Sequence, residues 1–463
     1  MKQQSVNRRT FIKWSGLGVT SALGASCVRA ESPTLATRGS VAEPARETPV
    51  AGEYDVVVCG AGPAGTAAAI AAARSGAKTQ LLELHGCLGG IWTSGLLAYI
   101  LDAANKRGLM DEMLQRIAEA SARSTGRSPK RSTCCDPEIV KIVLESLCEE
   151  AGVRIQYHTR VCAARVDRDR DNQLTHVIVE AKSGRQAFAG KVFLDCTGDG
   201  DLGVAAGCQH QFGQPGTGLS QPMSMICLLT GVEEKDVRPF YASSGSDWAG
   251  PKDRLRVEME RGGLSPSYGK PSLFPVHEGL FMLMANHEYG FKGTKADDVT
   301  AATLRARREL HQLIDGLRSL GGPWKNIRIV ATPEQIGVRE GRRLAGLYEM
   351  TADDLLEGRQ QPDTVCPVTF PVDVHALDPK KEKGIEKSSV RVKPYQIPLR
   401  ALIAKDVNGL MMAGRCISGD FIAHASYRVT GNAVAMGEAA GKVAAVAAKT
   451  NRLPQDVKIG DTI

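Results

Sequence analysis

Apolar and polar positions follow one another along the chain in the order that is typical of a βαβ unit. Tyr54–Cys59 is a short β-branched run, which predicts a buried strand of a parallel sheet. The alanine-rich run Thr66–Ser75 predicts the helix that follows, and Thr79–Leu84 predicts a second strand. The folded part of the chain is therefore predicted to be α/β.

Further elements follow at wide intervals. Asp136, which precedes a proline, predicts the capped start of a helix over 137–150. In the middle of the chain, Ser224–Leu229 predicts a strand, and Ala301–Leu320 predicts a helix capped by Thr300. The alanine-rich run Ala433–Ala448 predicts a further helix.

Most of the positive charge lies at the amino terminus. The formal net charge is +7, and residues 1–30 carry five lysines and arginines with no acid, which leaves +2 for the rest of the chain. That balance lacks the basic footprint of a nucleic-acid-binding protein. The 12 cysteines are spaced irregularly, often inside apolar runs, which favours small core residues over disulfides, with a Cys134–Cys135 bond as the alternative. Without a Cys-x-x-Cys or a His-rich tract, no metal site is predicted.

The first 30 residues resemble a bacterial twin-arginine signal. Arg8 and Arg9 precede a short apolar run, Trp14–Val28, and a small-residue site ends at Ala30. The run is too short to span a bilayer. We therefore expect export to the periplasm or the outside, with 31–52 as a disordered linker. The alternatives are a basic helix on a membrane surface and a lipoprotein anchored at Cys27.

A glycine-rich loop follows the first strand and predicts a dinucleotide site. Glycines in this pattern permit a tight turn, close approach of the backbone to a pyrophosphate, and close packing of helix on strand. Glu83 ends the second strand, where a carboxylate accepts hydrogen bonds from a ribose diol. The loop residues predicted to contact the dinucleotide are Gly60, Ala61, Gly62, Pro63, Ala64 and Gly65.

The segment Gly86–Gly95, which directly follows this acid, resembles the second glycine patch of FAD-dependent oxidoreductases with a glutathione-reductase-type Rossmann fold. The resemblance implies noncovalent FAD as the cofactor. It also implies further strands of the same fold at Gly152–Ile155, Thr159–Val161, Val192–Asp195 and Leu410–Met412. It also implies that the helix over Ala433–Ala448 points its amino terminus at the flavin pyrimidine ring, where its dipole stabilises negative charge. The further residues implied to bind FAD are Gly89, Gly90, Val161, Gly198, Asp199, Gly414, Asp420 (to the ribityl chain) and Asn432.

The resemblance also implies how the chain is divided. An α+β substrate domain is inserted into the FAD domain. The expected segments are a signal peptide at 1–30, a linker at 31–52, FAD-binding parts at 53–211 and 390–450, the inserted domain at 212–389 and a tail at 451–463. With no second glycine loop for NAD(P)H, the implied activity is hydride transfer from a small organic substrate to flavin N5, with electrons leaving to an external acceptor. The alternatives are a non-redox flavoprotein and a binding protein with a vestigial site.

His424 and Arg428 are predicted to act on the reacting side of the flavin, because they lie between Asp420 and the flavin-facing helix. A neutral histidine there removes a hydroxyl or amine proton as hydride departs. Arg428 holds an anionic group or stabilises reduced flavin. The structural alternatives are that His424 only binds backbone and that Arg428 only pairs with Asp420.

Two further segments carry chemistry that the sequence leaves open. Arg339 and Arg343 lie four positions apart and would share one face of a helix. They either clamp an anionic substrate or pair with Glu340 and Asp353 as part of the structure. Pro371–His375 contains an aspartate and a histidine, and for these two residues the sequence likewise does not distinguish a role in the site from a structural role.

Overall fold

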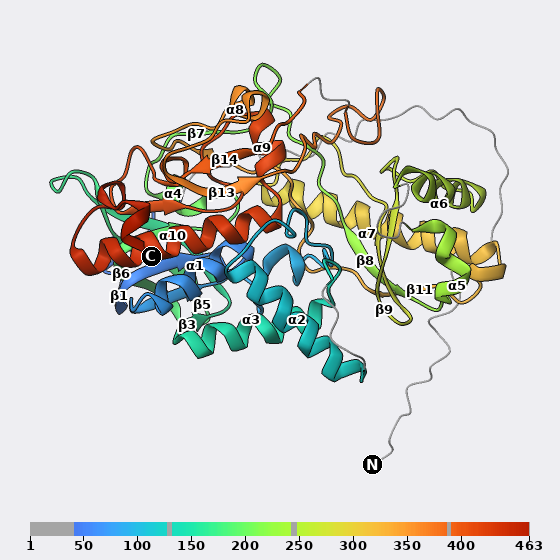
Figure 1. Cartoon of the computed structure of the whole chain (residues 1–463), viewed down its shortest axis with the longest axis horizontal. Helices are drawn as coiled ribbons and strands as arrows, with labels where there is room; N and C mark the ends of the chain where they lie inside the picture. The colour runs from blue at the N-terminus through green and yellow to red at the C-terminus, as the bar shows by residue number, and fades with distance from the viewer. Residues whose placement is uncertain (1–40, 127–131, 242–247, 387–389, 463) are drawn as a thin grey trace, which may run out of the picture. The chain divides into compact units, whose positions relative to one another are not determined.

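The computed structural model describes residues 41–126, 132–241, 248–386 and 390–462 (Figure 1). The expected signal segment, and the linker as far as residue 40, lie outside these ranges. Residues 44–463 form one unit of packed elements. Within the described ranges, no helix combines the length and the apolar character that crossing a membrane requires.

The largest sheet carries the glycine loops at one edge. Its strand order is β3-β2-β1-β6-β5-β4, and β15 also pairs with β6. The strands are β1 (Val50–Cys59), β2 (Thr79–Leu82), β3 (Arg154–Gln156), β4 (Thr159–Asp167), β5 (Gln173–Ala181), β6 (Gly184–Asp195) and β15 (Leu410–Met412). β3, β2, β1, β6 and β15 run parallel, so their carboxyl ends meet at one edge, where doubly wound folds bind their ligands.

β6 joins two kinds of sheet. Its first half, from Gly184 to Ala189, pairs antiparallel with β5, which in turn pairs antiparallel with β4. Its last residues, Phe193–Asp195, pair in parallel with β15, while its other edge follows β1. The antiparallel extension and the parallel dinucleotide sheet therefore share one long strand.

Helices α1 (Pro63–Arg74) and α10 (Thr430–Thr450) lie side by side on this sheet (Figure 1). They approach so closely that there is no room for a side chain at two positions of α10. A Cβ on Gly437 would lie 2.1 Å from the carbonyl oxygen of Ala64, and one on Gly441 would lie 2.2 Å from that of Ala68. α2 (Leu109–Thr125) and α3 (Pro137–Ala151) pack beside α1 and α10, with Asp136 capping α3 as predicted.

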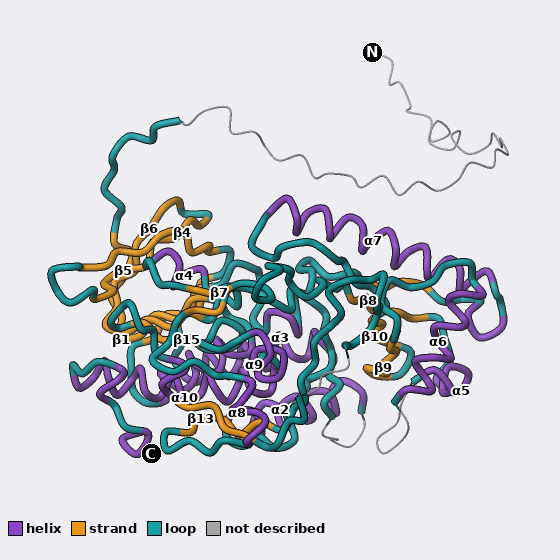
Figure 2. Tube along the Cα trace, turned by 90° about the horizontal axis from the view of Figure 1, so that it is seen from above, coloured by secondary structure: helices purple, strands orange, loops and turns teal. Residues whose placement is uncertain are grey.

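A second sheet forms around the middle of the chain. It contains β8 (Ile226–Thr230), β9 (Ser272–His277), β10 (Leu280–Met284) and β11 (Arg328–Ala331) in the antiparallel order β11-β8-β10-β9. Figure 2 shows α6 (Ala249–Arg261) and α7 (Ala296–Ser319) beside these strands. The buried residues form an apolar cluster of their own, which runs from Met223 to Val338.

The rest of the expected inserted segment packs elsewhere. Leu344, Val368 and Ile397 belong to the apolar cluster of the first sheet, together with α1 and α10. The elements of these connecting regions are α4 (Asp201–Ala205), β7 (His210–Gln211), β12 (Arg343–Leu344), α8 (Ala352–Glu357), β13 (Thr364–Val368), β14 (Tyr395–Pro398) and α9 (Phe421–Tyr427). The short helix α5 (Glu234–Val237) instead packs with the second sheet, since Val237 belongs to its apolar cluster. Packing thus associates the chain from Leu344 onward with the FAD-binding part rather than with the second sheet.

Three local predictions are wrong. β1 begins inside the expected linker, because the strand already pairs with β6 from Val50. α7 begins at Ala296, and Thr300 does not cap it, because its hydroxyl donates to the Ala296 carbonyl one turn earlier. The segment from Arg339 to Arg343 is not a helix, because Gly337 just before it forms a β-bridge with Ser224. All cysteines within the described ranges are free, and most of them are buried, which fits small core residues.

The contact between α1 and α10 predicts a stability effect. Gly441→Ala places a methyl group against the Ala68 carbonyl, so we expect the free energy of unfolding to fall by about 1–3 kcal/mol. Urea unfolding followed by far-UV circular dichroism measures it. The control is Gly460→Ala, whose methyl group would meet no atom within 4 Å. Equal stability of the two variants would contradict the packing.

Candidate active site

The glycine loops of three distant segments meet at the carboxyl edge of the parallel strands. The Gly89 amide donates to the Ala61 carbonyl at 2.8 Å, and a Cβ on Gly90 would lie 2.9 Å from the Cα of Gly62. A Cβ on Gly414 would lie 3.3 Å from the Ala64 side chain. The structure therefore brings the first glycine loop, the second glycine patch and the turn after β15 into one place, as the sequence predicted.

Open space lies at the centre of the first loop. A Cβ on Gly62 would meet no protein atom within 4 Å, whereas one on Gly65 would overlap the carbonyl oxygen of Gly60. Gly60 has φ +92°, a conformation that glycine adopts without strain. α1 begins at Pro63, so its free amides and positive dipole end face that open position. Gly65 therefore serves the close packing of α1, whereas Gly62 leaves open space at the start of that helix.

Glu83 lies beside this loop. It is 5% exposed, and its carboxylate accepts the amide protons of Ala61 at 2.5 Å and His85 at 2.8 Å. Its backbone bonds to Gln156 and Thr159, which places the start of β4, with Val161 two residues further on, next to the predicted ribose position. Glu83, the first glycine loop and the start of β4 thus lie next to one another, where the adenosine moiety of the dinucleotide is predicted to bind.

The turn after β6 contributes an ion pair. Asp199 accepts from Nη2 of Arg415 at 2.9 Å, and a Cβ on Gly198 would lie 2.8 Å from that same nitrogen. Asp195, at the end of β6, is fully buried, and burial raises its pKa although the Gly203 amide and both donors of Thr197 hydrogen-bond to it. The sequence analysis did not single out Arg415, although it stands next to Gly414 in the predicted motif.

Asp420 has an observed structural role. Its two carboxylate oxygens accept the backbone amides of Ala423 at 2.7 Å, as the N-cap of α9, and of Ala352 at 2.8 Å. It does not pair with Arg428. That alternative is wrong, because the Arg428 guanidinium bonds instead to the carbonyl of Asp373 at 2.7 Å and lies 3.4 Å from its carboxylate. The predicted contact of Asp420 with the ribityl chain stays a prediction.

Buried polar atoms without a protein partner are concentrated near these loops. Ten such side-chain atoms occur among the described residues, and eight belong to Trp92, Gln221, Gln335, Arg415, His424, Arg428 and Thr430. Gln221 bonds to Arg428, and Gln335 bonds through its backbone to Ser94, two residues after Trp92. Thr430 opens α10, two residues before the predicted FAD ligand Asn432, which is buried and bonds to the Tyr427 carbonyl. Because buried polar groups normally have partners, this arrangement fits a large polar ligand such as FAD.

His424 is the most isolated of these groups. It is fully buried, and neither ring nitrogen has a hydrogen-bond partner. Burial lowers the pKa of His424 well below its usual value, and the charges of Arg343, Arg428 and Arg415 lower it further, while a contact with the Arg415 backbone raises it. The imidazole is therefore neutral at pH 7, and at least one of its ring nitrogens is available to a ligand.

Residues of the middle segment complete the site. Arg343 pairs with Glu340 at 2.7 Å inside the protein, which confirms the structural interpretation for that arginine. Asp373 and His375, which the sequence left open, contact each other at 3.2 Å, and His375 contacts His287 at 3.1 Å. The sequence analysis missed His287, because it precedes His375 by 88 positions and no local motif marks it.

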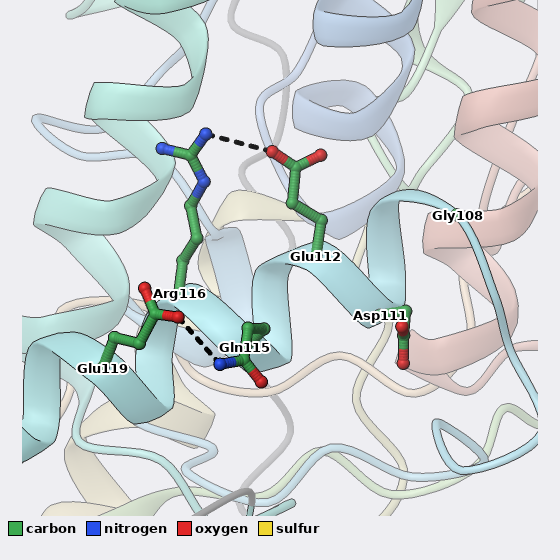
Figure 3. A pocket seen from close by; sticks show the side chains of 6 residues that line it. All are labelled: Gly108, Asp111, Glu112, Gln115, Arg116 and Glu119. Atoms are coloured by element: carbon green, nitrogen blue, oxygen red, sulfur yellow. Dashed lines mark hydrogen bonds and ion pairs between the residues drawn. The ribbon is translucent and has the colours of Figure 1, made fainter. Parts of the chain in front are cut away.

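A surface hollow on α2 is not part of this site. Figure 3 shows its lining, in which Arg116 pairs with Glu112. Glu112 also pairs with Arg74, outside the lining. Arg74 ends α1, so this hollow lies roughly 17 Å along the helix from the glycine loop at the other end. Glu112 and Arg116 are already paired, and Glu119 accepts from the Gln115 amide at 2.7 Å, so these groups serve the packing of the helices.

Comparison with known families identifies the chain. The profile of the family described as FAD dependent oxidoreductase matches residues 55–462, nearly all of the described chain. The protein belongs to the FAD-dependent oxidoreductase family. Its cofactor is FAD, and the protein is an FAD-dependent oxidoreductase with a mixed α/β fold and a Rossmann-like sheet.

Similar solved structures are distant. A geranylgeranyl bacteriochlorophyll reductase-like protein from Thermoplasma acidophilum is 14% identical over 86% of this chain and 79% of its own, with a TM-score of 0.42. The flavin-dependent brominase Bmp2 is 13% identical over 86% and 80%, with a TM-score of 0.43. The p-nitrophenol 4-monooxygenase PnpA from Pseudomonas putida DLL-E4 is 14% identical over 64% and 70%, with a TM-score of 0.38. No curated protein matches significantly. Likenesses of this size carry no information about the substrate.

The open position at Gly62 predicts a variant that folds but lacks its cofactor. Gly62→Val fills the space in which the pyrophosphate would lie and touches little of the protein, so we expect normal unfolding behaviour and a loss of bound FAD of at least tenfold. The measurement is the visible absorbance per protein after gel filtration. Gly62→Ala serves as the graded control and should retain more FAD. Normal FAD content in the valine variant would show that the pyrophosphate lies elsewhere.

Proposed function

We propose that this family member oxidises a small organic substrate by hydride transfer and passes the electrons to an external acceptor. The observation that carries the proposal is the group of buried, unpartnered polar atoms from Arg415 to Thr430, beside the glycine loops. A catalytic site needs such groups free to bind a flavin and a substrate. The structural role of flavin in a non-redox protein would not require an unpartnered imidazole.

The proposed roles follow from the surroundings of each residue. FAD, when bound, supplies the hydride acceptor. His424 accepts the hydroxyl or amine proton of the substrate, since its imidazole is buried, neutral and without a partner. Arg428 provides a fixed positive charge, and the amino terminus of α10 adds its dipole. We further propose a glutathione-reductase-type arrangement of the FAD, with adenosine near Glu83 and the flavin near α10.

The proton-accepting role of His424 is testable in a single turnover. Anaerobic screening of alcohols, sugars, amines and acids against the yellow protein identifies a reducing substrate, and stopped-flow absorbance then follows flavin reduction. His424→Gln should slow the reductive half-reaction by roughly 10²-fold, because the general base is lost. FAD content should stay unchanged.

The control is His277→Gln, which alters an exposed histidine of the second sheet. A near-normal rate in the His424 variant with FAD bound would return this residue to a structural role. If none of these substrates reduces the flavin of the unmodified protein, the non-redox alternative is favoured instead.

We also propose export in folded form, which rests on Arg8 and Arg9 alone. Replacing both with lysine should strand FAD-containing protein in the cytoplasm, because a twin-arginine receptor distinguishes the two side chains although their charge is equal. Cell fractionation followed by flavin fluorescence measures the distribution. Lys2→Arg is the control. Unchanged export of the double variant would indicate the general secretory route.

A further inference from the structure

Two arginines from distant segments face the same buried region. Nη1 of Arg339, just beyond the second sheet, donates to the carbonyl of Pro222 at 2.8 Å and to Oγ of Ser224 at 2.6 Å. Arg428, which follows α9, donates from Nη2 to the carbonyl of Asp373. Nη2 of Arg428 also donates to the side-chain oxygen of Gln221 at 3.2 Å, and Gln221 directly precedes Pro222, so the two guanidinium groups bind adjacent residues. Both are anchored through a single nitrogen.

Two buried hydrogen-bond donors in this region have no acceptor. Nε of Arg428 and Nε2 of Gln221 are buried and have no partner. The Gln221 oxygen is already used, since it accepts from Arg428 at 3.2 Å and from the His375 amide at 3.0 Å. The Gln221 amide nitrogen therefore presents its protons to whatever occupies the adjacent space. A partner made of acceptors would satisfy these atoms.

The same region carries an excess positive charge. Burial and the charge of Arg428 lower the pKa of Arg339 to about 10, so it remains charged at pH 7, as does Arg428. Asp373 supplies one negative charge, because its neighbours His375, Arg428 and Arg339 outweigh burial and hold its pKa below the usual range. The Glu340 and Arg343 pair is neutral overall. A buried excess charge is costly unless an anion offsets it.

A chain of hydrogen bonds fixes Asp373 in place. Its Oδ2 lies 3.2 Å from Nε2 of His375, whose Nδ1 lies 3.1 Å from Nε2 of His287, whose Nδ1 lies 3.1 Å from the Tyr289 hydroxyl. Burial lowers the pKa of both histidines, that of His375 to about 4, so both are neutral at pH 7. Because the Asp373 carboxylate can only accept, Nε2 of His375 donates to it, and Nδ1 of His375 then accepts from Nε2 of His287. The Tyr289 hydroxyl lies 3.1 Å from the remaining His287 nitrogen and 3.2 Å from the Ser267 carbonyl, and its single proton serves one of these two acceptors. The carboxylate is thereby held toward His375 and Arg428, and it makes no ion pair with Arg339.

The region is reachable and adjoins the FAD site. The side chains of Asp373 and Arg428 retain 18% and 9% exposure, and Arg339 is also partly exposed. Arg428 lies two residues before α10, and the segment that leads to Arg339 bonds to the second glycine patch, where the Gln335 amide donates to the Ser94 carbonyl at 3.1 Å. An anion held here would lie between the FAD-binding loops and the second sheet.

We propose that Arg339, Arg428 and the Gln221 amide bind the carboxylate of a small organic acid, so that the substrates of this oxidoreductase are monocarboxylates. A carboxylate carries one negative charge and takes two parallel hydrogen bonds from a planar guanidinium group. It therefore matches both the single excess positive charge and the planar donors of this region. This inference rests on the proposed function, since it names the substrate class for the same site.

The test compares a carboxylate with a neutral molecule of the same shape. Calorimetric titration of the FAD-loaded protein at low ionic strength should show propionate binding at least tenfold more tightly than propionamide. Arg339→Gln should weaken propionate binding at least tenfold and leave propionamide binding unchanged, while Arg339→Lys should restore part of the affinity. Arg256→Gln, which removes an exposed charge from α6, is the matched control and should bind propionate normally.

Equal binding of propionate and propionamide, or unchanged propionate binding in the folded Arg339→Gln protein, would overturn the inference. If Arg339→Gln does not fold, the propionate preference of the unmodified protein and the behaviour of Arg339→Lys still decide it. Reduction of the flavin by a neutral alcohol without propionate binding would defeat the carboxylate site and leave the proposed oxidoreductase function standing. Propionate binding in a protein whose flavin no substrate reduces would support the carboxylate site and count against the proposed oxidation.

Discussion

The backbone contact between α1 and α10 is the constraint on which the site depends. Gly437 and Gly441 let α10 approach the carbonyl oxygens of α1 more closely than any side chain would permit. α1 begins at the first glycine loop, and α10 begins at Thr430, just after His424 and Arg428. A helix pair fixed at this distance therefore holds a cofactor loop from the start of the chain beside catalytic candidates from its end.

A second constraint joins the inserted sheet to this framework. Ser224 forms a bridge with Gly337, while Gln335 bonds to Ser94 of the second glycine patch, so β8 and the cofactor patch share one connecting segment. Arg339 follows that segment directly and bonds to Pro222, next to the Gln221 that Arg428 contacts. The charged groups of the site are thus supplied by two bodies with separate apolar clusters, and the short segment between Gln335 and Arg339 positions them relative to each other.

Burial determines the chemistry of these groups. His424, His375 and His287 are kept neutral by desolvation and by neighbouring arginines, whereas Asp373 stays ionised because positive groups surround it. An FAD enzyme that removes a hydride must also remove a proton, and a neutral buried imidazole suits that task. The family membership agrees with this chemistry, and it leaves the substrate to be determined by the residues beyond the flavin.

The sequence by itself determined the dinucleotide fold. The β-branched strand, the glycine loop and Glu83 are local features, because glycine conformation and strand burial depend on residues close together in the chain. The cofactor followed from several such segments, each recognisable alone.

Predictions from local pattern were wrong where tertiary contacts decide the conformation, as in the expected helix at Arg339 and the expected cap at Thr300. Only the tertiary structure showed that Arg428 bonds to Asp373 rather than Asp420, that His375 meets His287, and that His424 has no partner. Those facts depend on distances between residues far apart in the sequence and on the exclusion of water, and neither is encoded in any local motif.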